Sequence, residues 1–351
     1  MTAVAVTGIA AVAGRPDDSL ETLVFRGAAA ALADAGLDRT DLDGVVLAAS
    51  DMTDGRAITS MLTSGPAGAY LNDEINAASS PGHALALAYM QILGGAHERL
   101  LVSSWGKASE APAGSDAAER LSADPFLERD GGLSALAASA LQAQRHRLGD
   151  PERATAAARR VAARNGGVTE DAVAASPLVA TPLRALEVPP GVDASFSIVL
   201  ERAAAGAGVR LAGVGWCADT GRVAERDLLG LPHLALAARD AFARADVTDP
   251  ATDVGAWFLH DTSPDAELLA YAPLGLCRPG EGLDLALDGD TSAVNPGGGS
   301  VRGEAPFGGP LGKVVEAVRH VRGRGVQRAL AHLTTGFAGQ FQTVAIVERA
   351  A

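Results

Sequence analysis

ALADAGLDRTDLDGVVLAASD (residues 31–51) aligns without a gap on AFARADVTDPATDVGAWFLHD (residues 241–261). The alignment sets Leu32 against Phe242 and Leu37 against Val247, and it also matches Asp43 with Asp253 and Asp51 with Asp261. In each stretch an alanine-rich segment with helical spacing leads into a short apolar run typical of a buried strand. Internal similarity of this kind predicts a duplicated domain.

The order of the neighbouring segments supports the duplication. A predicted helix at 83–93 and strand at 100–102 correspond to a predicted helix at 310–323 and strand at 328–333. Strands that alternate with helices at these lengths indicate an α/β protein. The start of the chain fits the same pattern, with a predicted strand at Val4–Ile9 and a predicted helix over Leu20–Gly36.

We therefore expect two similar halves, residues 1–205 and 206–351, packed across a pseudo-two-fold axis. The first half includes an inserted region at 105–165. Its polar part, residues 105–132, is predicted to form surface loops. Helices are predicted to follow at about 133–147 and 151–165.

Composition excludes several functional classes. The 351 residues are 48% hydrophobic, and 29 Lys+Arg against 42 Asp+Glu leave a formal net charge of −13, which makes nucleic acid a poor partner. Two cysteines, Cys217 and Cys277, suit neither a disulfide framework nor structural zinc. No apolar run reaches the ~18–20 residues of a membrane span, and the start MTAVAVTG lacks a basic region before an apolar run. We expect a cytoplasmic protein without a membrane partner.

Two segments carry a family resemblance: HDTSPDAELLAYAPLGLCRPGEG (residues 260–282) and VNPGGGSVRGEAPFGGPLG (residues 294–312). They resemble the thiolase superfamily, especially its sterol-carrier-protein-x or lipid-transfer branch, whose members show HDCFS, ELL-x-Y-x-x-LGLC, GEG, VNPSGG and GHP-x-G motifs. The stretch SPLVATPLR (residues 176–184) is similar to that branch too. The resemblance implies a duplicated α/β fold in αβαβα layers.

The resemblance also shows that most of the catalytic apparatus has been replaced. Thiolases attack a thioester with a cysteine at a helix N-terminus. In the matching stretch NAASSPG (residues 76–82) that position holds Ser79, or Ser80 if the register slips by one. The GHP histidine falls on Gly309, and the C-terminal cysteine falls on Thr334 or Thr335. Only the His260–Asp261 pair remains, so ordinary thiolysis is not expected.

The candidate catalytic residues are therefore Ser79, His260 and Glu304, with Glu304 standing in for the lost imidazole. The candidate substrate-binding residues are Ser80, His83, Asp261, Asn295, Gly298, Gly309, Thr334 and Thr335. Structural alternatives stay open: a solvated carboxylate at Glu304, a helix-surface histidine at His83, a loop-fixing hydrogen bond at His260–Asp261, and a glycine turn at 297–299 that needs positive φ.

Three functions fit these residues. The first is an enzyme that makes or breaks a carbon–carbon bond in an acyl-CoA thioester. It resembles the thiolase-like aldolases, which lack the cysteine and work with a small OB-fold, zinc-ribbon partner, although those aldolases are associated with tyrosines where this chain has His260. The second is an acyltransferase that uses Ser79. The third is a non-catalytic subunit that supports an active paralogue. We expect coenzyme A as part of the substrate, no covalently bound cofactor, and a homodimer or a heterodimer with a paralogue.

Overall fold

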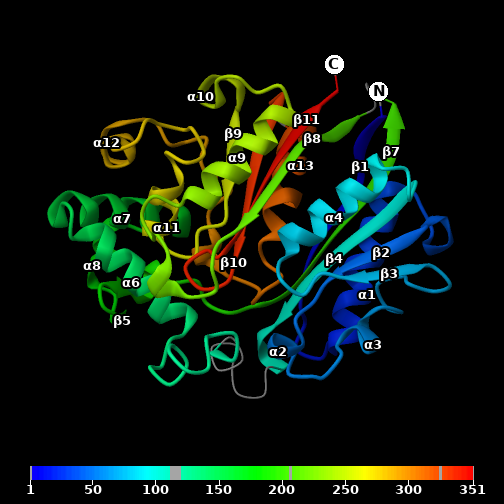
Figure 1. The fold of residues 1–351 in the computed structure, drawn as a ribbon, viewed down its shortest axis with the longest axis horizontal. Helices are drawn as coiled ribbons and strands as arrows, with labels where there is room; N and C mark the ends of the chain where they lie inside the picture. The colour runs from blue at the N-terminus through cyan, green and yellow to red at the C-terminus, as the bar shows by residue number, and fades with distance from the viewer. Residues whose placement is uncertain (1, 111–119, 205–207, 324–325, 351) are drawn as a thin grey trace.

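The computed structural model describes residues 2–110, 120–204, 208–323 and 326–350, and a nine-stranded mixed sheet runs through it (Figure 1). The strand order is β3-β2-β4-β7-β1-β8-β11-β10-β9. The strands are β1 (Thr2–Ala13), β2 (Gly44–Ala48), β3 (Asp73–Asn76), β4 (Arg99–Lys107), β7 (Asp193–Ala204), β8 (Val209–Ala218), β9 (Ala256–Leu259), β10 (Arg328–Thr335) and β11 (Phe341–Arg349).

Among the described strands, the two halves of the sheet pair with each other only through β1 and β8, at Val4–Leu211 and Ala5–Arg210, so they form two layers, and four long helices complete the five. The helices α4 (Pro81–Leu93) and α13 (Leu311–Gly323) share one buried apolar cluster with strands from both ends of the sheet, so they form the middle layer. On the outside, α1 (Leu20–Ala35) packs on β1 and β7, and α9 (Pro232–Arg244) packs on β8 and β11. This arrangement confirms the predicted α-β-α-β-α fold.

The two ends of the sheet have corresponding topologies. From one end of the sheet toward its middle the strands β2-β4-β7-β1 follow each other, and from the other end β9-β10-β11-β8. In both series the first pair, β2–β4 or β9–β10, is parallel, and the second pair, β4–β7 or β10–β11, is antiparallel. In sequence, β1-α1-β2-α4-β4-β7 is followed by β8-α9-β9-α13-β10-β11. The predicted division at 205/206 itself lies outside the described residues.

The inserted region forms a separate group of helices beside the layers (Figure 1). The helices α6 (Ala135–Arg147) and α7 (Pro151–Gly166) confirm the two helices predicted there. Shorter elements are α2 (Asp51–Asp54), α3 (Ser60–Thr63), α8 (Glu170–Ala175), α10 (Pro250–Asp253), α11 (Pro264–Ala270), α12 (Gly282–Asp288) and the hairpin β5 (Leu178–Ala180) with β6 (Leu183–Arg184). Within the described parts of the chain, none of the helices has the length and apolarity needed to cross a bilayer.

The prediction of a surface loop over 105–132 is wrong at its beginning. Residues 105–107 continue β4 and are buried, because Trp105 donates its indole N–H to Asp54 and Lys107 pairs with Asp193. The segment 111–119 of that predicted loop lies outside the described residues.

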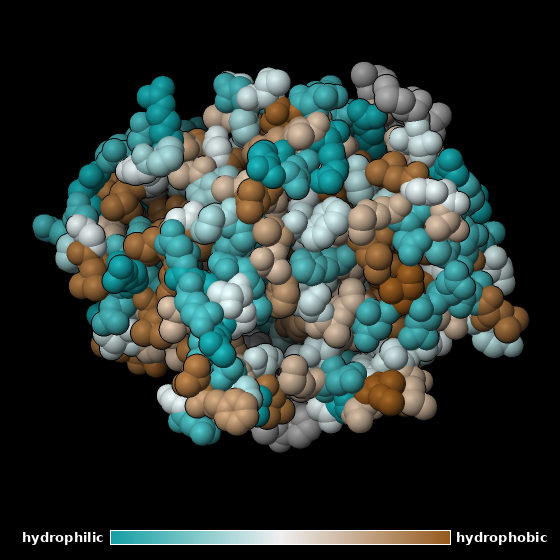
Figure 2. All heavy atoms as spheres, in the orientation of Figure 1, coloured by the Kyte–Doolittle hydropathy of each residue, from teal (hydrophilic) through white to brown (hydrophobic). Residues whose placement is uncertain are grey.

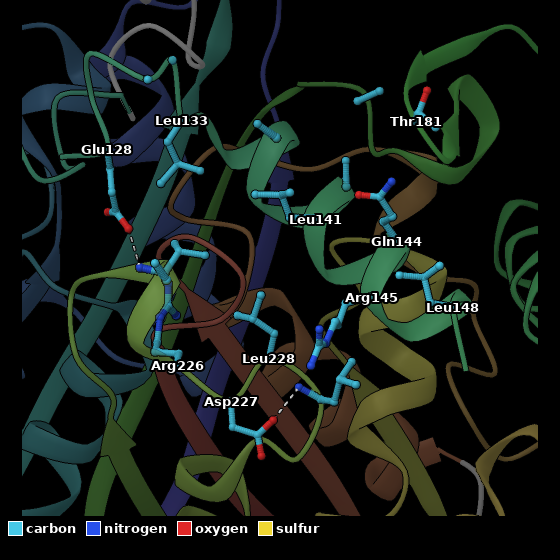
Figure 3. Close-up of a pocket in the computed structure, with 18 residues that line it drawn as sticks. Glu128, Leu133, Leu141, Gln144, Arg145, Leu148, Thr181, Arg226, Asp227 and Leu228 are labelled. Atoms are coloured by element: carbon cyan, nitrogen blue, oxygen red, sulfur yellow. Dashed lines mark hydrogen bonds between the residues drawn. The ribbon is translucent and has the colours of Figure 1, made fainter. Parts of the chain in front are cut away.

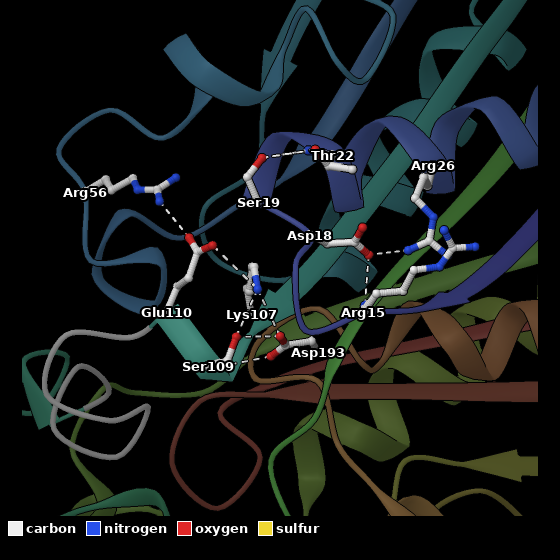
Figure 4. A network of polar contacts seen from close by, with 10 residues as sticks. All are labelled: Arg15, Asp18, Ser19, Thr22, Arg26, Arg56, Lys107, Ser109, Glu110 and Asp193. Atoms are coloured by element: carbon white, nitrogen blue, oxygen red, sulfur yellow. Dashed lines mark hydrogen bonds and ion pairs between the residues drawn. The ribbon is translucent and has the colours of Figure 1, made fainter.

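A polar network fixes the carboxyl end of β4 (Figure 4). Lys107 Nζ lies 3.0 Å from Asp193 Oδ2 on β7 and 3.5 Å from Glu110 Oε1, and Ser109 donates its hydroxyl to Asp193 at 2.6 Å. Glu110 in turn accepts a hydrogen bond from Arg56 at 2.7 Å. The network matters for the candidate site because the loop 304–309 packs directly on this end of β4.

A buried arginine connects the inserted helices to the rest of the protein. Arg147 at the end of α6 donates to Glu187 Oε1 and to Asp265 Oδ2, both at 2.7 Å. Asp265, on α11, is fully buried, and Glu187 is 3% exposed. Removal of the guanidinium would leave two carboxylates buried without their cation.

We expect Arg147→Met to lower the free energy of unfolding by about 3–5 kcal/mol, because breaking a buried ion pair leaves an uncompensated charge. Arg145→Met, on the exposed side of the same helix, should change it by no more than about 0.5 kcal/mol. Urea denaturation followed by circular dichroism measures both. Equal effects of the two substitutions would contradict the anchoring role of Arg147.

Candidate active site

The N-terminus of α4 begins with a Ser-Pro-Gly sequence that suits a helix start. Ser80 is the N-cap, its hydroxyl accepts the Gly82 N–H at 3.1 Å, and Pro81 occupies the first turn. A Cβ at Gly82 would lie 2.4 Å from Thr343 Oγ1, so only glycine lets α4 approach β11 this closely. Ser80 therefore caps the helix, and its part in substrate binding stays a prediction.

Ser79 and His83 lie one helical turn apart and contact each other. Ser79 Oγ is 3.1 Å from His83 Nδ1, and the Ser79 carbonyl accepts the Thr335 hydroxyl, also at 3.1 Å. The His83 ring packs edge-on against Phe341, with 5.3 Å between centroids. Burial lowers the pKa of His83, so its imidazole is neutral near pH 7.

Beyond the end of β9 the structure brings His260, Glu304 and Gly309 together. His260 Nε2 lies 2.9 Å from Glu304 Oε1, an ion-pair distance, although the two groups are not aligned for a hydrogen bond. A Cβ at Gly309 would lie only 1.9 Å from the same Glu304 oxygen. The Glu304 carboxylate thus fills the space that a side chain at position 309 would enter, which is where the resemblance places the lost imidazole.

The Asp261 side chain is buried and points into the interior of the protein. Its carboxylate accepts the Ser300 N–H at 2.7 Å and the Asn165 amide at 2.8 Å, and Lys313 Nζ is 3.9 Å away. Burial raises the pKa of Asp261, and the positive charge of Lys313 opposes the rise. These bonds match the loop-fixing alternative for the His260–Asp261 pair, and substrate binding by Asp261 stays a prediction.

Asn295 and Gly298 shape the loop in front of α13. The Asn295 side chain accepts the Leu259 N–H and donates to Glu267, both at 2.9 Å, and its backbone has φ 45°. Gly298 has φ 103°, and a Cβ there would lie 2.5 Å from Arg302 Nε. Both residues have structural tasks in this loop, so the contacts give no support to their predicted part in substrate binding, which stays untested.

The strand β10 separates the two threonines that the resemblance offered for the second cysteine. Side chains alternate along a strand, so Thr335 faces α4 and Ser79, whereas Thr334 faces the opposite side with His332. Thr334 Oγ1 is buried and has no hydrogen-bond partner among the described residues. His332 lies 2.6 Å from Gln342 Oε1, and burial lowers its pKa to about 4. Only Thr335 therefore joins the Ser79 group.

Sequence reasoning missed Lys313, Phe341 and Thr343. Lys313 is 4% exposed on α13, between Asp261 and Glu316. A lysine on the apolar side of a predicted helix is a signal that could have found it. Phe341 and Thr343 lie on β11 and contact α4, which no pattern in their own segment indicates.

Several buried polar atoms near α4 and β9 have no hydrogen-bond partner among the described residues: His83 Nε2, Thr343 Oγ1 and His260 Nδ1. Buried polar atoms are rarely left unpaired, because each lost hydrogen bond costs free energy. Such atoms, here at the start of α4 and beyond the end of β9, are typical of positions that bind a ligand or ordered water.

A separate cavity of about 1040 Å³ lies between α6 and the loop 223–229 (Figure 3). Leucines make up much of its wall, together with Arg226, whose three guanidinium nitrogens have no hydrogen-bond partner among the described residues. Burial lowers the pKa of Arg226, against the opposing effect of Asp219 and Glu128. None of the predicted site residues lines this cavity, but Leu228 on its wall packs in one apolar cluster with Phe337, two residues beyond Thr335.

Comparison with known proteins agrees with the fold. Residues 215–347 match the family model described as thiolase C-terminal domain-like. This C-terminal part of the chain is therefore similar to the thiolase C-terminal domain. No curated protein matches its sequence at a significant level.

Solved structures show the same fold over nearly the whole chain. A structure described as an Ltp2-ChsH2(DUF35) aldolase has a TM-score of 0.79 and 19% identity, and covers 99% of this chain and 98% of that one. Human mitochondrial 3-ketoacyl-CoA thiolase has a TM-score of 0.75 and 15% identity, with 99% of both chains covered. A monomeric SCP2-thiolase-like protein type 1 from Mycobacterium smegmatis has a TM-score of 0.73 and 19% identity, with 99% of this chain and 77% of that chain covered.

The contact between Gly309 and Glu304 can be tested in this thiolase-fold protein by a double-mutant cycle. Gly309→Ala should lower the free energy of unfolding by about 1–3 kcal/mol, because the new Cβ overlaps the carboxylate. In a Glu304→Ala background the same substitution should cost no more than about 0.5 kcal/mol. Thermal and urea unfolding measure both, and additive effects would show that the carboxylate does not occupy this space.

Proposed function

We propose that the protein acts on an acyl-CoA thioester and makes or breaks a carbon–carbon bond without a cysteine nucleophile. The observation that carries this proposal is the His260–Glu304 pair, which lies against Gly309, the position to which the resemblance assigns the thiolase imidazole. The neighbour described as an aldolase supports the same reaction class. Coenzyme A enters as part of the substrate, and no covalently bound cofactor is needed.

In the cleavage direction, the substrate is a β-hydroxyacyl-CoA. A base removes the proton of the β-hydroxyl, the bond between the α and β carbons breaks, and the electron pair forms a thioester enolate. We assign the first proton transfer to Glu304 because its side chain is the more accessible to a substrate, 21% exposed against 4% for His260. His260, whose Nε2 lies 2.9 Å away, can take that proton from Glu304 and return it to the α carbon of the enolate. The products are a carbonyl compound and a shorter acyl-CoA.

The cavity beside α6 offers room for the part of the substrate remote from the reacting bond. Its wall combines apolar leucines with the cationic Arg226, which suits a chain with an apolar body and a polar or anionic end. Leu228, on the wall of this cavity, packs against the apolar cluster that contains Phe337, two residues beyond Thr335.

A second candidate is a non-catalytic subunit that supports an active paralogue or a small OB-fold partner. The strand β3 is an edge of the sheet, and large apolar side chains of the preceding segment are exposed. They are Ile58, Met61, Leu62, Tyr70 and Leu71. Such an edge with apolar neighbours favours association with another chain.

For the enzymatic function, we expect His260→Ala and Glu304→Gln each to lower turnover of a β-hydroxyacyl-CoA by ~10²-fold or more, because each removes a proton-transfer group. Glu152→Gln, an exposed carboxylate on α7, serves as the matched control and should be unaffected. The release of the carbonyl product is measured, with circular dichroism to check the fold. If both variants keep full turnover, the non-catalytic candidate replaces this proposal.

For association, we expect the protein to dimerise, alone or with a paralogue, through the β3 edge. Light scattering should give about twice the chain mass of 35.4 kDa. Leu71→Asp should shift the dimer to monomer, since Leu71 is 91% exposed beside that edge. Leu236→Asp on the distant helix α9 is the control. A monomer at micromolar concentration, with and without partners, would contradict this interface; the similar Mycobacterium smegmatis protein is itself described as monomeric.

A further inference from the structure

Arg226, on the wall of the cavity beside α6, is buried without a close partner for its charge. The residue is 9% exposed, and Nε, Nη1 and Nη2 make no hydrogen bond among the described residues. The carboxylates of Asp219 and Glu128 act on it only through their charge. Arg147, which is 7% exposed, shows the usual arrangement, since it donates to two buried carboxylates. Because buried charges in proteins are normally paired, Arg226 indicates a position that binds a ligand.

The acidic side chains of the same cavity wall are already engaged by backbone N–H groups. Asp227 accepts the Leu229 and Gly230 N–H groups at 3.1 and 3.0 Å, and Glu128 Oε1 accepts the Val223 N–H at 2.6 Å. The other oxygen of Glu128 is buried and has no partner among the described residues. Three donor nitrogens on the guanidinium thus stand against one acceptor oxygen, so the group that binds here is mainly a hydrogen-bond acceptor.

A carboxylate meets this requirement best. It accepts two parallel hydrogen bonds from a guanidinium and neutralises its charge, which a carbonyl or hydroxyl group does not. The Arg226 nitrogens have almost no exposed surface, so neighbouring side chains change rotamer when the carboxylate binds, as is common at binding sites. Arg145, the other cation of the cavity wall, is exposed to water, where an ion pair contributes little.

The rest of the cavity suits an apolar chain. Leu133, Leu141, Leu148 and Leu228 contribute to its wall, and its volume of about 1040 Å³ is at the upper end for sites of drug-sized ligands. Leu141 and Leu148 are also 48% and 68% exposed, and Figure 2 shows hydrophobic side chains gathered over the inserted helices. Figure 3 shows Arg226 toward one end of the cavity and Leu148 toward the other. This arrangement fits an apolar chain with one charged end.

We propose that this cavity binds an organic carboxylate with an apolar body, and that Arg226 recognises the carboxylate. The inference rests on the proposed function in one respect, because it assigns the carboxylate to the end of the acyl group that is remote from the thioester. The substrate class is then the coenzyme A monothioester of a dicarboxylic acid. Arg226 determines substrate specificity in this account and takes no part in the proton transfers at His260 and Glu304.

Calorimetric titration with octanoate, which contains neither coenzyme A nor a hydroxyl group, tests the carboxylate site by itself. We expect one site per chain, with an affinity lowered about tenfold or more by Arg226→Met, which keeps an unbranched side chain but removes the charge. Octanamide has the same chain with a neutral end and should bind the wild type about tenfold or more weakly than octanoate. Arg239→Met, which removes an exposed cation on α9, is the matched control and should bind octanoate like the wild type.

Arg226→Met should stay folded, because the guanidinium makes no hydrogen bond among the described residues. Octanoate should raise the melting temperature of the wild type and of Arg239→Met, and raise that of Arg226→Met far less. A wild type that does not bind octanoate, or that binds octanoate and octanamide equally, would overturn the inference, and so would wild-type affinity in Arg226→Met. The octanamide comparison uses the wild type alone, so it decides the question even if the variant fails to fold.

A second pair of ligands tests the assignment of the carboxylate to the acyl group. The coenzyme A monothioester of decanedioic acid should bind the wild type about tenfold or more tightly than decanoyl-CoA, and Arg226→Met should lose this difference. Octanoate binding that needs Arg226, together with equal binding of the two thioesters, would support the carboxylate site and contradict its assignment to the substrate. Neither measurement depends on turnover of a β-hydroxyacyl-CoA, so failure of this inference and failure of the proposed function are distinguishable.

Discussion

The close approach between the Glu304 carboxylate and Gly309 controls the layout of the candidate site. Because position 309 has no side chain, the carboxylate can lie against the backbone there and reach His260 at 2.9 Å. Gly308 adds a second constraint, since a Cβ at this residue would lie 2.2 Å from the backbone of Trp105. Two successive glycines thus let the loop pass over the end of β4 and start α13 beside His260. The absence of a side chain at position 309 and the placement of the Glu304 carboxylate beside His260 are thus parts of one arrangement.

The two helices of the middle layer then carry different chemistry at their starts. The N-terminus of α4 presents Ser79 and His83, while α13 follows the Glu304–Gly309 loop and carries the buried Lys313. A duplicated fold makes this division natural, because corresponding strands deliver corresponding helix starts to the centre. One fold can in this way carry different side chains at these two helix starts, since the fold and the chemistry depend on different residues.

Much of the fold could be predicted from the sequence because local signals agree with tertiary packing. The helix predicted over Leu20–Gly36 ends with Gly36 in the left-handed conformation, as a C-cap requires. The site was less predictable, because its contacts join distant segments. The sequence pattern does not distinguish Thr334 from Thr335. Only the structure shows that the side of β10 toward α4 carries Thr335, whose hydroxyl donates to the Ser79 carbonyl. Residues 105–107 were predicted to lie in a surface loop, because nothing in the local sequence shows that Lys107 pairs with Asp193, 86 residues away, and is buried at the end of β4.

The central claim is that Glu304, at the position to which the resemblance assigns an imidazole, forms part of a site that binds acyl-CoA. It is tested most directly by measuring ligand binding. Calorimetric titration with a thioether analogue of a β-hydroxyacyl-CoA separates binding from turnover. The account predicts saturable binding of one ligand per chain, weakened about tenfold or more by Glu304→Gln, because that variant removes a charged hydrogen-bond acceptor from the bound β-hydroxyl. A wild-type protein that shows no saturable binding of the analogue would contradict it.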